Sequence, residues 1–316
     1  ISSGSLVDGH TAILEFDSNS KIVNVGTVVN AIEDVLINDS SNNDVTDNYE
    51  IKKETGKIEV VKSASTNPTL TAYSGTYDGK AHTIGVSGGS GGEIKYSTDK
   101  TNWVSEKPTV VEATNSGAVT VYVKVFGDSN HNDSSIISST ISIAKASSTV
   151  SFTQTGGTYT GSGINVVASG VGSISYKYYS DSSCNTAITT TPIDAGTYYV
   201  KATSAGDSNH NGATTSCTTH TISKKTVSAT WNSTSSFTYD GNAHSRALAS
   251  KAVSGVNSET VNLTTSGSGT NVGSYTTTAS ISSVSGGRAK TSNYTLSNTS
   301  TTFNIIKANT TTTFTK

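Results

Sequence analysis

The sequence predicts an all-β chain of tandem, antiparallel two-sheet sandwiches arranged as an elongated rod. Three observations support this prediction: the composition, the alternation of apolar residues, and an internal repeat of about 80 residues. Of 316 residues, 52 are Thr and 53 are Ser, Gly occurs 29 times and Met is absent. Thr is branched at Cβ and suits a pleated, half-buried strand, whereas Gly favours tight turns.

The repeat is clearest where each unit ends. Two residues, in most copies apolar, are followed by a lysine, and these lysines are spaced by 83, 79 and 83 residues. They are Lys62, Lys145, Lys224 and Lys307. Two positions before the first of these two residues stands another apolar residue, Ile58, Ile141 or Phe303, which is the spacing of one face of a strand. In the remaining copy, which ends at Lys224, His220 stands there. A fixed period of this length is typical of a tandem array.

Two turn signals recur inside the units. The first is Tyr77-Asp78-Gly79, Tyr159-Thr160-Gly161 and Tyr239-Asp240-Gly241, at steps of 82 and 80 residues. Because Gly accepts positive φ, this signal predicts a tight hairpin turn. The second signal is Asn24-Val25-Gly26, Asn115-Ser116-Gly117, Asp194-Ala195-Gly196 and Asn271-Val272-Gly273.

The segment after the second turn signal alternates strictly in the second copy. Val119, Val121, Val123 and Val125 share one face, and polar or amphipathic residues share the other. This pattern predicts a strand that is buried on one side. Residues 28–37 could pass for an amphipathic helix, but their counterparts in the other copies are strands, so we expect strand there.

These signals divide the chain into five segments. Residues 1–63 form a partial repeat that lacks its opening strand, residues 309–316 form the opening strand of a following repeat, and three complete repeats lie between them. The complete repeats are 64–146, 147–225 and 226–308. We refer to the first four segments as the first, second, third and fourth repeats. Linkers are almost absent, which predicts a semi-rigid rod.

The charge pattern excludes several functions. The net charge is −2 and neither half carries a basic block, so nucleic acid is not an expected partner. No run of eighteen apolar residues is present, so membrane insertion is not expected. Residue 1 already lies in strand-like sequence, which indicates a processed protein or a piece of a longer one.

The Tyr-Asp-Gly-Lys-Ala-His-Thr segment at 77–83 resembles the bacterial surface repeat called the MBG domain, an immunoglobulin-like module. Residues 7–11, 44–50 and 194–198 share this resemblance, which extends over nearly the whole chain. It implies large secreted or wall-attached proteins in which such repeats act as spacers or adhesive stalks. It implies no catalytic residues. Thr160 departs from the Asp of the signature, and 163–164 depart from its Ala-His.

Several residues have a chemical and a structural interpretation. His131 and His210 lie in Asp-Ser-Asn-His-Asn segments, which could form a calcium loop but lack its spacing and its closing Glu, so a turn is favoured. Gly88 to Gly92 formally match a nucleophile elbow, but no helix or His partner is expected, so a flexible hairpin is favoured. The repeated lysines are expected to be too exposed for isopeptide crosslinks. Trp103 and Trp231 are expected to be core or inter-sheet residues.

Cys184 and Cys217 lie 33 residues apart in the third repeat. An even number of cysteines in an extracellular sandwich is consistent with a disulfide, and two free thiols packed as small apolar residues are the alternative. The other repeats contain no cysteine, so the fold does not require the pair. We predict no catalytic, cofactor or metal site.

The sequence favours a non-enzymatic extracellular structural protein, the stalk or fibre of a bacterial surface adhesin. Its expected partners are neighbouring repeats of the same protein. One alternative is the subunit of a self-assembling filament or phage fibre, in which 309–316 would complete the first repeat of another copy. A cut through a longer array explains both ends more simply. A second alternative is glycan binding through the tyrosines of the third repeat, Tyr176, Tyr178, Tyr179 and Tyr199.

Overall fold

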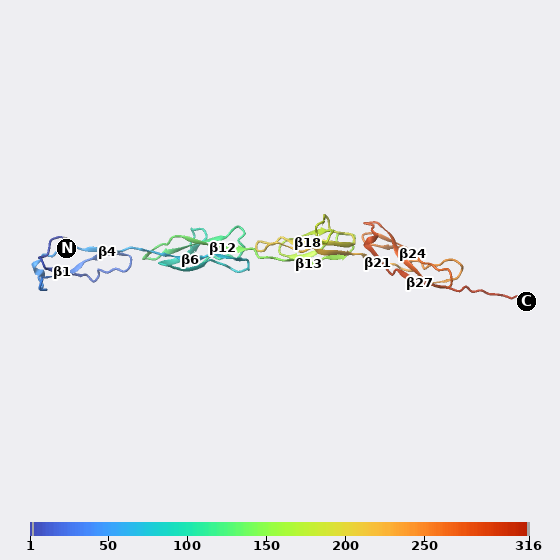
Figure 1. Cartoon of the computed structure of the whole chain (residues 1–316), viewed down its shortest axis with the longest axis horizontal. Helices are drawn as coiled ribbons and strands as arrows, with labels where there is room; N and C mark the ends of the chain where they lie inside the picture. Colours follow the sequence, from blue (N-terminus) through green and yellow to red (C-terminus); the bar gives the residue numbers. More distant parts are fainter. Residues whose placement is uncertain (2, 315–316) are drawn as a thin grey trace. The chain divides into compact units, whose positions relative to one another are not determined.

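The computed structural model describes residue 1 and residues 3–314. The chain forms two compact units, residues 1–145 and 146–316. The first unit contains the first and second repeats, and the second unit contains the third and fourth (Figure 1). The described residues form strands and two 3₁₀ turns and no α-helix, so the all-β prediction is confirmed. Residues 28–37 lie in strands apart from Ala31, which separates β2 from β3, as the repeat alignment predicts.

The first repeat consists of two small antiparallel sheets, β1–β3 and β2–β4. Its elements are β1 (Thr11–Phe16), β2 (Gly26–Asn30), β3 (Ile32–Asn38), η1 (Thr46–Asn48) and β4 (Gly56–Val60). Val35 and Ile37 are its buried apolar residues, whereas every residue of β1 is exposed. This repeat therefore has a much smaller core than the repeats that follow.

The second repeat packs the two-stranded sheet β6–β8 against the four-stranded sheet β7–β12–β10–β9. Its strands are β5 (Ser63–Ala64), β6 (Thr66–Thr71), β7 (Tyr73–Thr76), β8 (Gly85–Ser90), β9 (Gly92–Ser97), β10 (Val119–Gly127), β11 (His131–Asn132) and β12 (Ile137–Ala144). Val121, Val123 and Val125 are fully buried, which confirms the predicted face of this strand. Leu70 and Val86 pack on this core from the smaller sheet.

The third repeat has the same plan, with β13–β15 as its small sheet and β14–β20–β18–β16–β17 as its large one. Its strands are β13 (Val150–Gln154), β14 (Gly156–Thr158), β15 (Val167–Gly170), β16 (Ile174–Tyr179), β17 (Ala187–Ile188), β18 (Gly196–Ser204), β19 (Ala213–Thr214) and β20 (Thr218–Ser223). His220 is completely buried at the position of Ile141 and Phe303 in the neighbouring repeats. Its Nδ1 pairs with the Thr155 carbonyl, and its Nε2 has no hydrogen-bond partner among the described residues.

The fourth repeat pairs β21 with β26 and orders its large sheet β22–β27–β25–β24–β23. Its elements are β21 (Lys225–Ser228), β22 (Ser236–Thr238), β23 (Ala252–Ser254), β24 (Thr260–Ser266), β25 (Gly273–Ser285), η2 (Thr291–Asn293), β26 (Tyr294–Ser297) and β27 (Ser300–Ile306). Thr277, the polar exception in the alternation of β25, is fully buried, and its hydroxyl bonds the Arg246 amide. That hydrogen bond explains how a polar side chain is accommodated in the core.

The prediction of antiparallel sandwiches is wrong at two recurring positions, and one of them, the pairing of β5 with β11 and of β21 with β26, lies where a repeat begins. The other lies in the large sheet. In each complete repeat the strand before the Tyr-x-Gly turn pairs in parallel with the closing strand: β7 with β12, β14 with β20, and β22 with β27. The Tyr-x-Gly segment is therefore a turn but not a hairpin, because the strands on its two sides do not pair with each other. They lie in different sheets in the second and third repeats, and in the fourth they lie at opposite edges of the large sheet. The opening segment crosses from the small sheet to the large one, for example between β6 and β7.

The glycine run 88–92 is also not a hairpin. It connects β8, in the small sheet, to β9, in the large one, and so forms a corner between the layers. Gly88, Gly89 and Gly91 have φ values of 73°, 87° and 92°, which only Gly adopts readily. A Cβ on Gly92 would collide with the Phe126 carbonyl. Close packing and backbone conformation explain these glycines.

The C-terminal segment, predicted as the opening strand of a following repeat, lies apart from the sheets of the fourth repeat, and the prediction stays untested. Residues 309–314 have no regular secondary structure and leave the fourth repeat as an extended trace, while 315–316 lie outside the described residues (Figure 1). A strand requires a neighbouring strand for its backbone hydrogen bonds, and the described part of the chain brings none to this segment. Phe314 is 94% exposed.

Candidate functional site

The third and fourth repeats meet in a junction with contacts outside the sheets. One apolar core cluster continues across it, combining Tyr159 and Ile222 of the third repeat with Val227 and Tyr294 of the fourth. Tyr159 belongs to the Tyr-x-Gly turn and is only 1% exposed. The two repeats of this unit therefore share buried surface rather than a flexible linker.

A buried carboxylate lies at the centre of this junction. Glu259 is 2% exposed and accepts hydrogen bonds from the Tyr159 hydroxyl at 2.8 Å, the Tyr294 hydroxyl at 2.6 Å and the Arg288 amide at 2.8 Å. Burial acts to raise the pKa of Glu259, but these donors outweigh it and hold that pKa below its usual value. Burial, reinforced by the Glu259 carboxylate, raises the pKa of Tyr159 to about 12.

A second carboxylate joins the repeats at the edge of the same junction. Asp194, in the second turn signal of the third repeat, pairs with Lys290 at 2.5 Å and with Arg288 at 3.2 Å. The Asn293 side-chain amide also donates to it, at 3.0 Å. Burial alone would raise the pKa of Asp194, yet these three partners hold it well below its usual range. The aspartate is thus a charged clamp on the fourth repeat.

An asparagine docks into the second turn signal at this junction and at the junction between the first and second repeats. Asn293 Oδ1 accepts the Ala195 amide at 2.8 Å, and Asn130 Oδ1 accepts the Val25 amide at 2.9 Å. Asn130 also donates to Asn24, the counterpart of Asp194. The same contact, made by different repeats, indicates a common docking geometry.

The first strand of a repeat pairs with the segment that follows this asparagine. β5 pairs in parallel with β11, and β21 pairs in parallel with β26. The Lys62 ammonium donates to the carbonyls of Asp128 and His131 in the same loop. The junction lysine of the first repeat is therefore engaged with the next repeat's backbone, and no carboxylate or asparagine side chain is bonded to it among the described contacts.

The recurring histidines stabilise turns. Asp128 Oδ1 accepts the Asn130 amide and pairs with His131 at 2.6 Å, and Asp207 pairs with His210 at 2.9 Å. The His131 hydrogen bond is the main reason that the pKa of Asp128 is lowered. The described residues contain no group of His, Cys, Asp and Glu side chains that could hold a metal ion. These contacts favour the turn over the calcium loop.

His82 and His244 form a second equivalent pair. Each bonds the aspartate of its Tyr-Asp-Gly turn at 2.8 Å, and each stacks on an aromatic ring, Tyr73 for His82 and Phe237 for His244. The ring centroids lie 4.2 and 4.7 Å apart. The turn is thereby fixed against the strand that precedes it.

Cys184 and Cys217 are joined in a disulfide, with their Cα atoms 5.9 Å apart. The bond ties the loop between β16 and β17 to the residue just before β20, so it joins two connections beside the large sheet of the third repeat. The sequence leaves open a disulfide or two free thiols, and the structure contains the disulfide.

The tyrosines of the third repeat do not form an exposed aromatic surface. Tyr178 and Tyr179 are each 7% exposed, and Tyr178 belongs to a core cluster with Val200. Tyr176 is 38% exposed, and its hydroxyl accepts the Ala168 amide. Tyr199 is half-buried. This arrangement resembles cross-strand packing more than a platform for sugar rings.

The two tryptophans are half-buried. Trp231 packs against the core cluster of the fourth repeat and donates its Nε1 proton to the Asn298 carbonyl. Trp103 lies outside the core of the second repeat, edge-on to Phe126, with its Nε1 bonded to the Lys100 carbonyl. The expected core position is therefore confirmed for Trp231 only in part, and it is wrong for Trp103. Each indole N–H requires a hydrogen-bond acceptor, which holds the ring near the backbone at the edge of the core.

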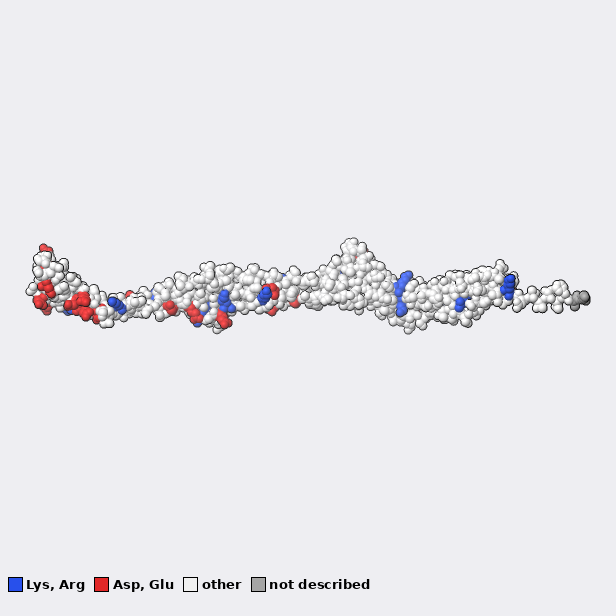
Figure 2. All heavy atoms as spheres, turned by 90° about the horizontal axis from the view of Figure 1, so that it is seen from below, with Lys and Arg blue, Asp and Glu red and all other residues white. Residues whose placement is uncertain are grey.

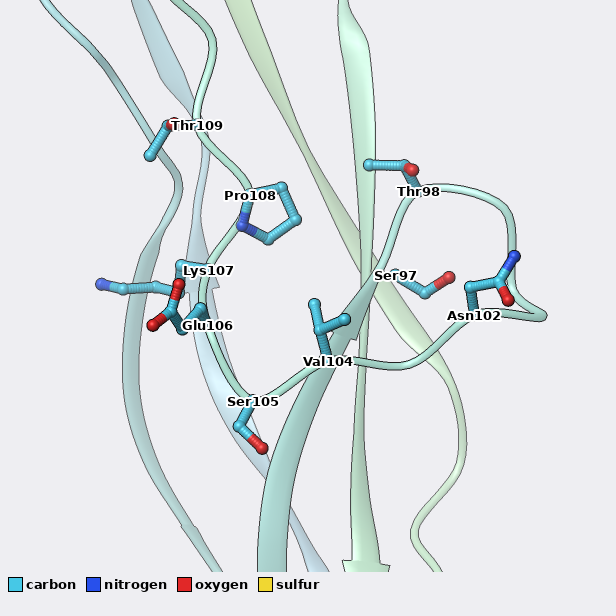
Figure 3. Close-up of a pocket in the computed structure, with 9 residues that line it drawn as sticks. All are labelled: Ser97, Thr98, Asn102, Val104, Ser105, Glu106, Lys107, Pro108 and Thr109. Atoms are coloured by element: carbon cyan, nitrogen blue, oxygen red, sulfur yellow. The ribbon is translucent and has the colours of Figure 1, made fainter.

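A hollow of about 640 Å³ lies beside the loop that follows β9. Its lining is mostly small and polar, and the side chains of Glu106 and Lys107 extend away from its centre (Figure 3). The adjacent carboxylate, Asp99, accepts hydrogen bonds from Thr101, Asn102 and Ser97, which lower its pKa and close the loop.

Sequence reasoning missed the junction carboxylates. Asp194 was identified only as a turn residue, and Glu259 was not singled out. Two sequence signals pointed to this junction. Tyr294 occupies the repeat position that His131 and His210 hold in the second and third repeats. Glu259 directly precedes β24, in which the buried residues are apolar. Their pairing across two repeats could not be found from spacing alone.

In the described part of the chain, no helix has the length and apolar character needed to span a membrane. No protein-family model and no curated protein sequence matches the chain. Among solved structures, Drosophila N-cadherin EC1-4 is 10% identical, with 97% of this chain and 94% of that chain covered and a TM-score of 0.21. Sidekick-1 immunoglobulin domains 1–4 are 11% identical over 90% and 83% of the two chains, with a TM-score of 0.23. At these TM-scores the similarity carries no conclusion about function.

Proposed function

We propose that this chain is a non-enzymatic, load-bearing spacer: tandem immunoglobulin-like modules of the MBG type that form the stalk or fibre of a bacterial surface protein. The observation that carries the proposal is the parallel pairing of the opening and closing strands in three repeats. The disulfide supports an oxidising, extracellular location.

The parallel pairing gives each repeat a mechanical property. Consider two parallel paired strands, with force applied to the N-terminus of one and the C-terminus of the other. The force then runs along the strands, so all the hydrogen bonds between them bear load at the same time. In the second repeat these bonds join Tyr73–Thr76 to Ile141–Ala144. Tension along a tandem array enters each repeat at its opening strand and leaves at its closing strand, so the array is loaded in this resistant direction.

The junctions extend this property along the array. The shared core cluster and the Glu259 and Asp194 contacts join the third and fourth repeats without an intervening linker. A linker-free junction restricts bending, which is what a spacer requires. We therefore propose a semi-rigid rod for the whole chain.

Small-angle X-ray scattering of the full chain tests the rod. Four repeats of about 30–40 Å each give a rod with a radius of gyration of about 35–45 Å. A compact globule of the same length would have a radius of gyration of about 20 Å. A radius of gyration near about 20 Å, independent of salt and protein concentration, would contradict the spacer proposal.

A further inference from the structure

The outer face of the large sheet in the third repeat carries two lysines directly opposite each other. Lys177 of β16 and Lys201 of β18 are partners in the antiparallel ladder. Their ammonium nitrogens lie 5.7 and 5.9 Å from the centre of the same aromatic ring, that of Tyr179, so both charges gather at one place on the sheet. Like charges directly opposite each other destabilise a sheet, so this pair costs stability unless a negative charge compensates it.

The second repeat shows how such a pair is compensated. Lys95 and Lys124 are ladder partners at the equivalent position, and both lie over the ring of Phe126. Here each lysine has a carboxylate partner: Glu93 Oε2 lies 3.3 Å from the Lys95 ammonium nitrogen. Asp133 Oδ2 lies 2.6 Å from the Lys124 ammonium nitrogen. The lysine pair of the second repeat is therefore balanced by acids of the same repeat.

The third repeat has neutral residues in place of both carboxylates. Ser175 stands at the position of Glu93, two residues before the first lysine of the pair. Gly212 stands at the position of Asp133, two residues after the recurring histidine. Among the described residues, no carboxylate lies within ion-pair distance of either lysine of the third repeat. The same arrangement of lysines is thus left with a net positive charge.

The acidic residues of the third repeat, three aspartates, are all engaged elsewhere. Asp181 accepts backbone amides of residues 183–186. Asp194 pairs with the fourth repeat, and Asp207 pairs with His210. On the face that it displays, Figure 2 shows acidic side chains over the first and second repeats and few over the third. A positive charge without an internal partner attracts an anion from solution.

The surface around the lysine pair is rich in hydroxyl groups. Ser175, Thr203 and Thr214 are exposed on the same face, in ladder register with one another. The exposed large apolar residues of this repeat, Val167 and Tyr176, lie on β15 and on the inner face of β16. A protein interface has an apolar centre, which this face does not offer. A chain of hydroxylated sugars that carries acid groups fits both the charge and the hydroxyls.

We propose that the outer face of the third repeat binds an acidic polysaccharide, with one acid group of the polysaccharide held between the ammonium groups of Lys177 and Lys201. Both ammonium groups donate charge-assisted hydrogen bonds to the acid group, and the sugar hydroxyls bond the serine and threonine hydroxyls beside it. Sugar rings do not stack on Tyr179, because this residue is only 7% exposed. The site goes beyond the spacer, which requires no ligand.

Isothermal titration calorimetry of the full chain with hexagalacturonate, which carries one carboxylate per sugar, tests the site. The chain binds one equivalent at low ionic strength, and higher salt weakens the binding. The fully methyl-esterified hexasaccharide, which has the same sugars without the charge, does not bind. Lys177→Gln with Lys201→Gln raises the dissociation constant about tenfold and does not lower the unfolding temperature, because it also removes the repulsion. Lys201→Arg retains binding.

Exchanging the compensating residues between the two repeats tests the mechanism. Ser175→Glu places a carboxylate where the second repeat has Glu93, and it weakens binding about tenfold although both lysines remain. Ser175→Gln is the matched control of the same size without the charge, and it leaves the dissociation constant unchanged. Glu93→Gln with Asp133→Asn frees the lysine pair of the second repeat and adds a second binding site to the chain.

Four results would overturn the proposal. They are no binding of hexagalacturonate, equal effects of Ser175→Glu and Ser175→Gln, no second site after Glu93→Gln with Asp133→Asn, and equally tight binding of hexaglutamate. The last of these would show that the face recognises charge alone, in a peptide as well as in a sugar. The scattering measurement decides the spacer separately, because the radius of gyration of the free chain does not depend on a ligand.

Discussion

Removal of one hydroxyl from the junction should uncouple the third and fourth repeats. Tyr159→Phe keeps the ring in the shared core and deletes only the hydrogen bond to Glu259, 2.8 Å long and almost fully buried. A hydrogen bond to a charged group contributes about 1.5–3 kcal/mol, and the carboxylate retains its Tyr294 and Arg288 donors. We therefore expect the free energy of unfolding of this unit to fall by about 1.5–3 kcal/mol.

The assay is equilibrium urea unfolding followed by tryptophan fluorescence in a Trp103→Phe background, in which Trp231 reports on the fourth repeat. The repeat itself offers the control. Tyr239 holds the same place in the fourth repeat but is 42% exposed, so Tyr239→Phe should change stability by less than about 0.5 kcal/mol. Equal effects of the two substitutions would refute the reasoning, because the hydroxyl would then act inside its own repeat.

Three further outcomes follow. His220→Phe removes the buried Nε2 that has no partner among the described residues but also the Nδ1 bond to the Thr155 carbonyl, so these effects should largely cancel and the stability of the third repeat should change by less than about 1 kcal/mol; a larger change in thermal unfolding would contradict this. Cys184→Ala with Cys217→Ala should lower stability by about 3–4 kcal/mol, measured against the oxidised chain; no change would show that the bridge is dispensable. Because the pKa of Asp194 is depressed, its contribution is fully present above about pH 4 and declines as pH falls toward that pKa, so Asp194→Ala should destabilise clearly less near pH 2 than at pH 7. An equal effect at both values would exclude the charged clamp.

Much of the fold follows from local pattern. The alternation around Val121 determines which face of β10 is buried, and the lysine period places the ends of the repeats close to where strands end and begin. What the pattern could not supply is the partner of each strand. The Asp-Gly turns resemble hairpin turns locally, but the strands beside them do not pair with each other, and only the packed structure decides this.

The junction shows the same limit. The repeat alignment marks Asn130 and Asn293 as equivalent, but it does not show that each bonds the backbone of the preceding repeat. Glu259 is an isolated acid in the sequence, and its importance comes from two tyrosines that lie 100 and 35 residues away. Contacts of that kind depend on how one repeat is seated on the next.

The most direct test of the load-bearing account is to pull the fourth repeat, within the full chain, in two directions. Cysteine handles at Thr226 and Ala308 load the parallel strands β22 and β27 along their length. Handles at Asp240 and Lys307 grip the same end of this pair and peel its hydrogen bonds one after another. We expect the first geometry to require a several-fold higher unfolding force at equal loading rate. Equal forces in the two directions would contradict the account.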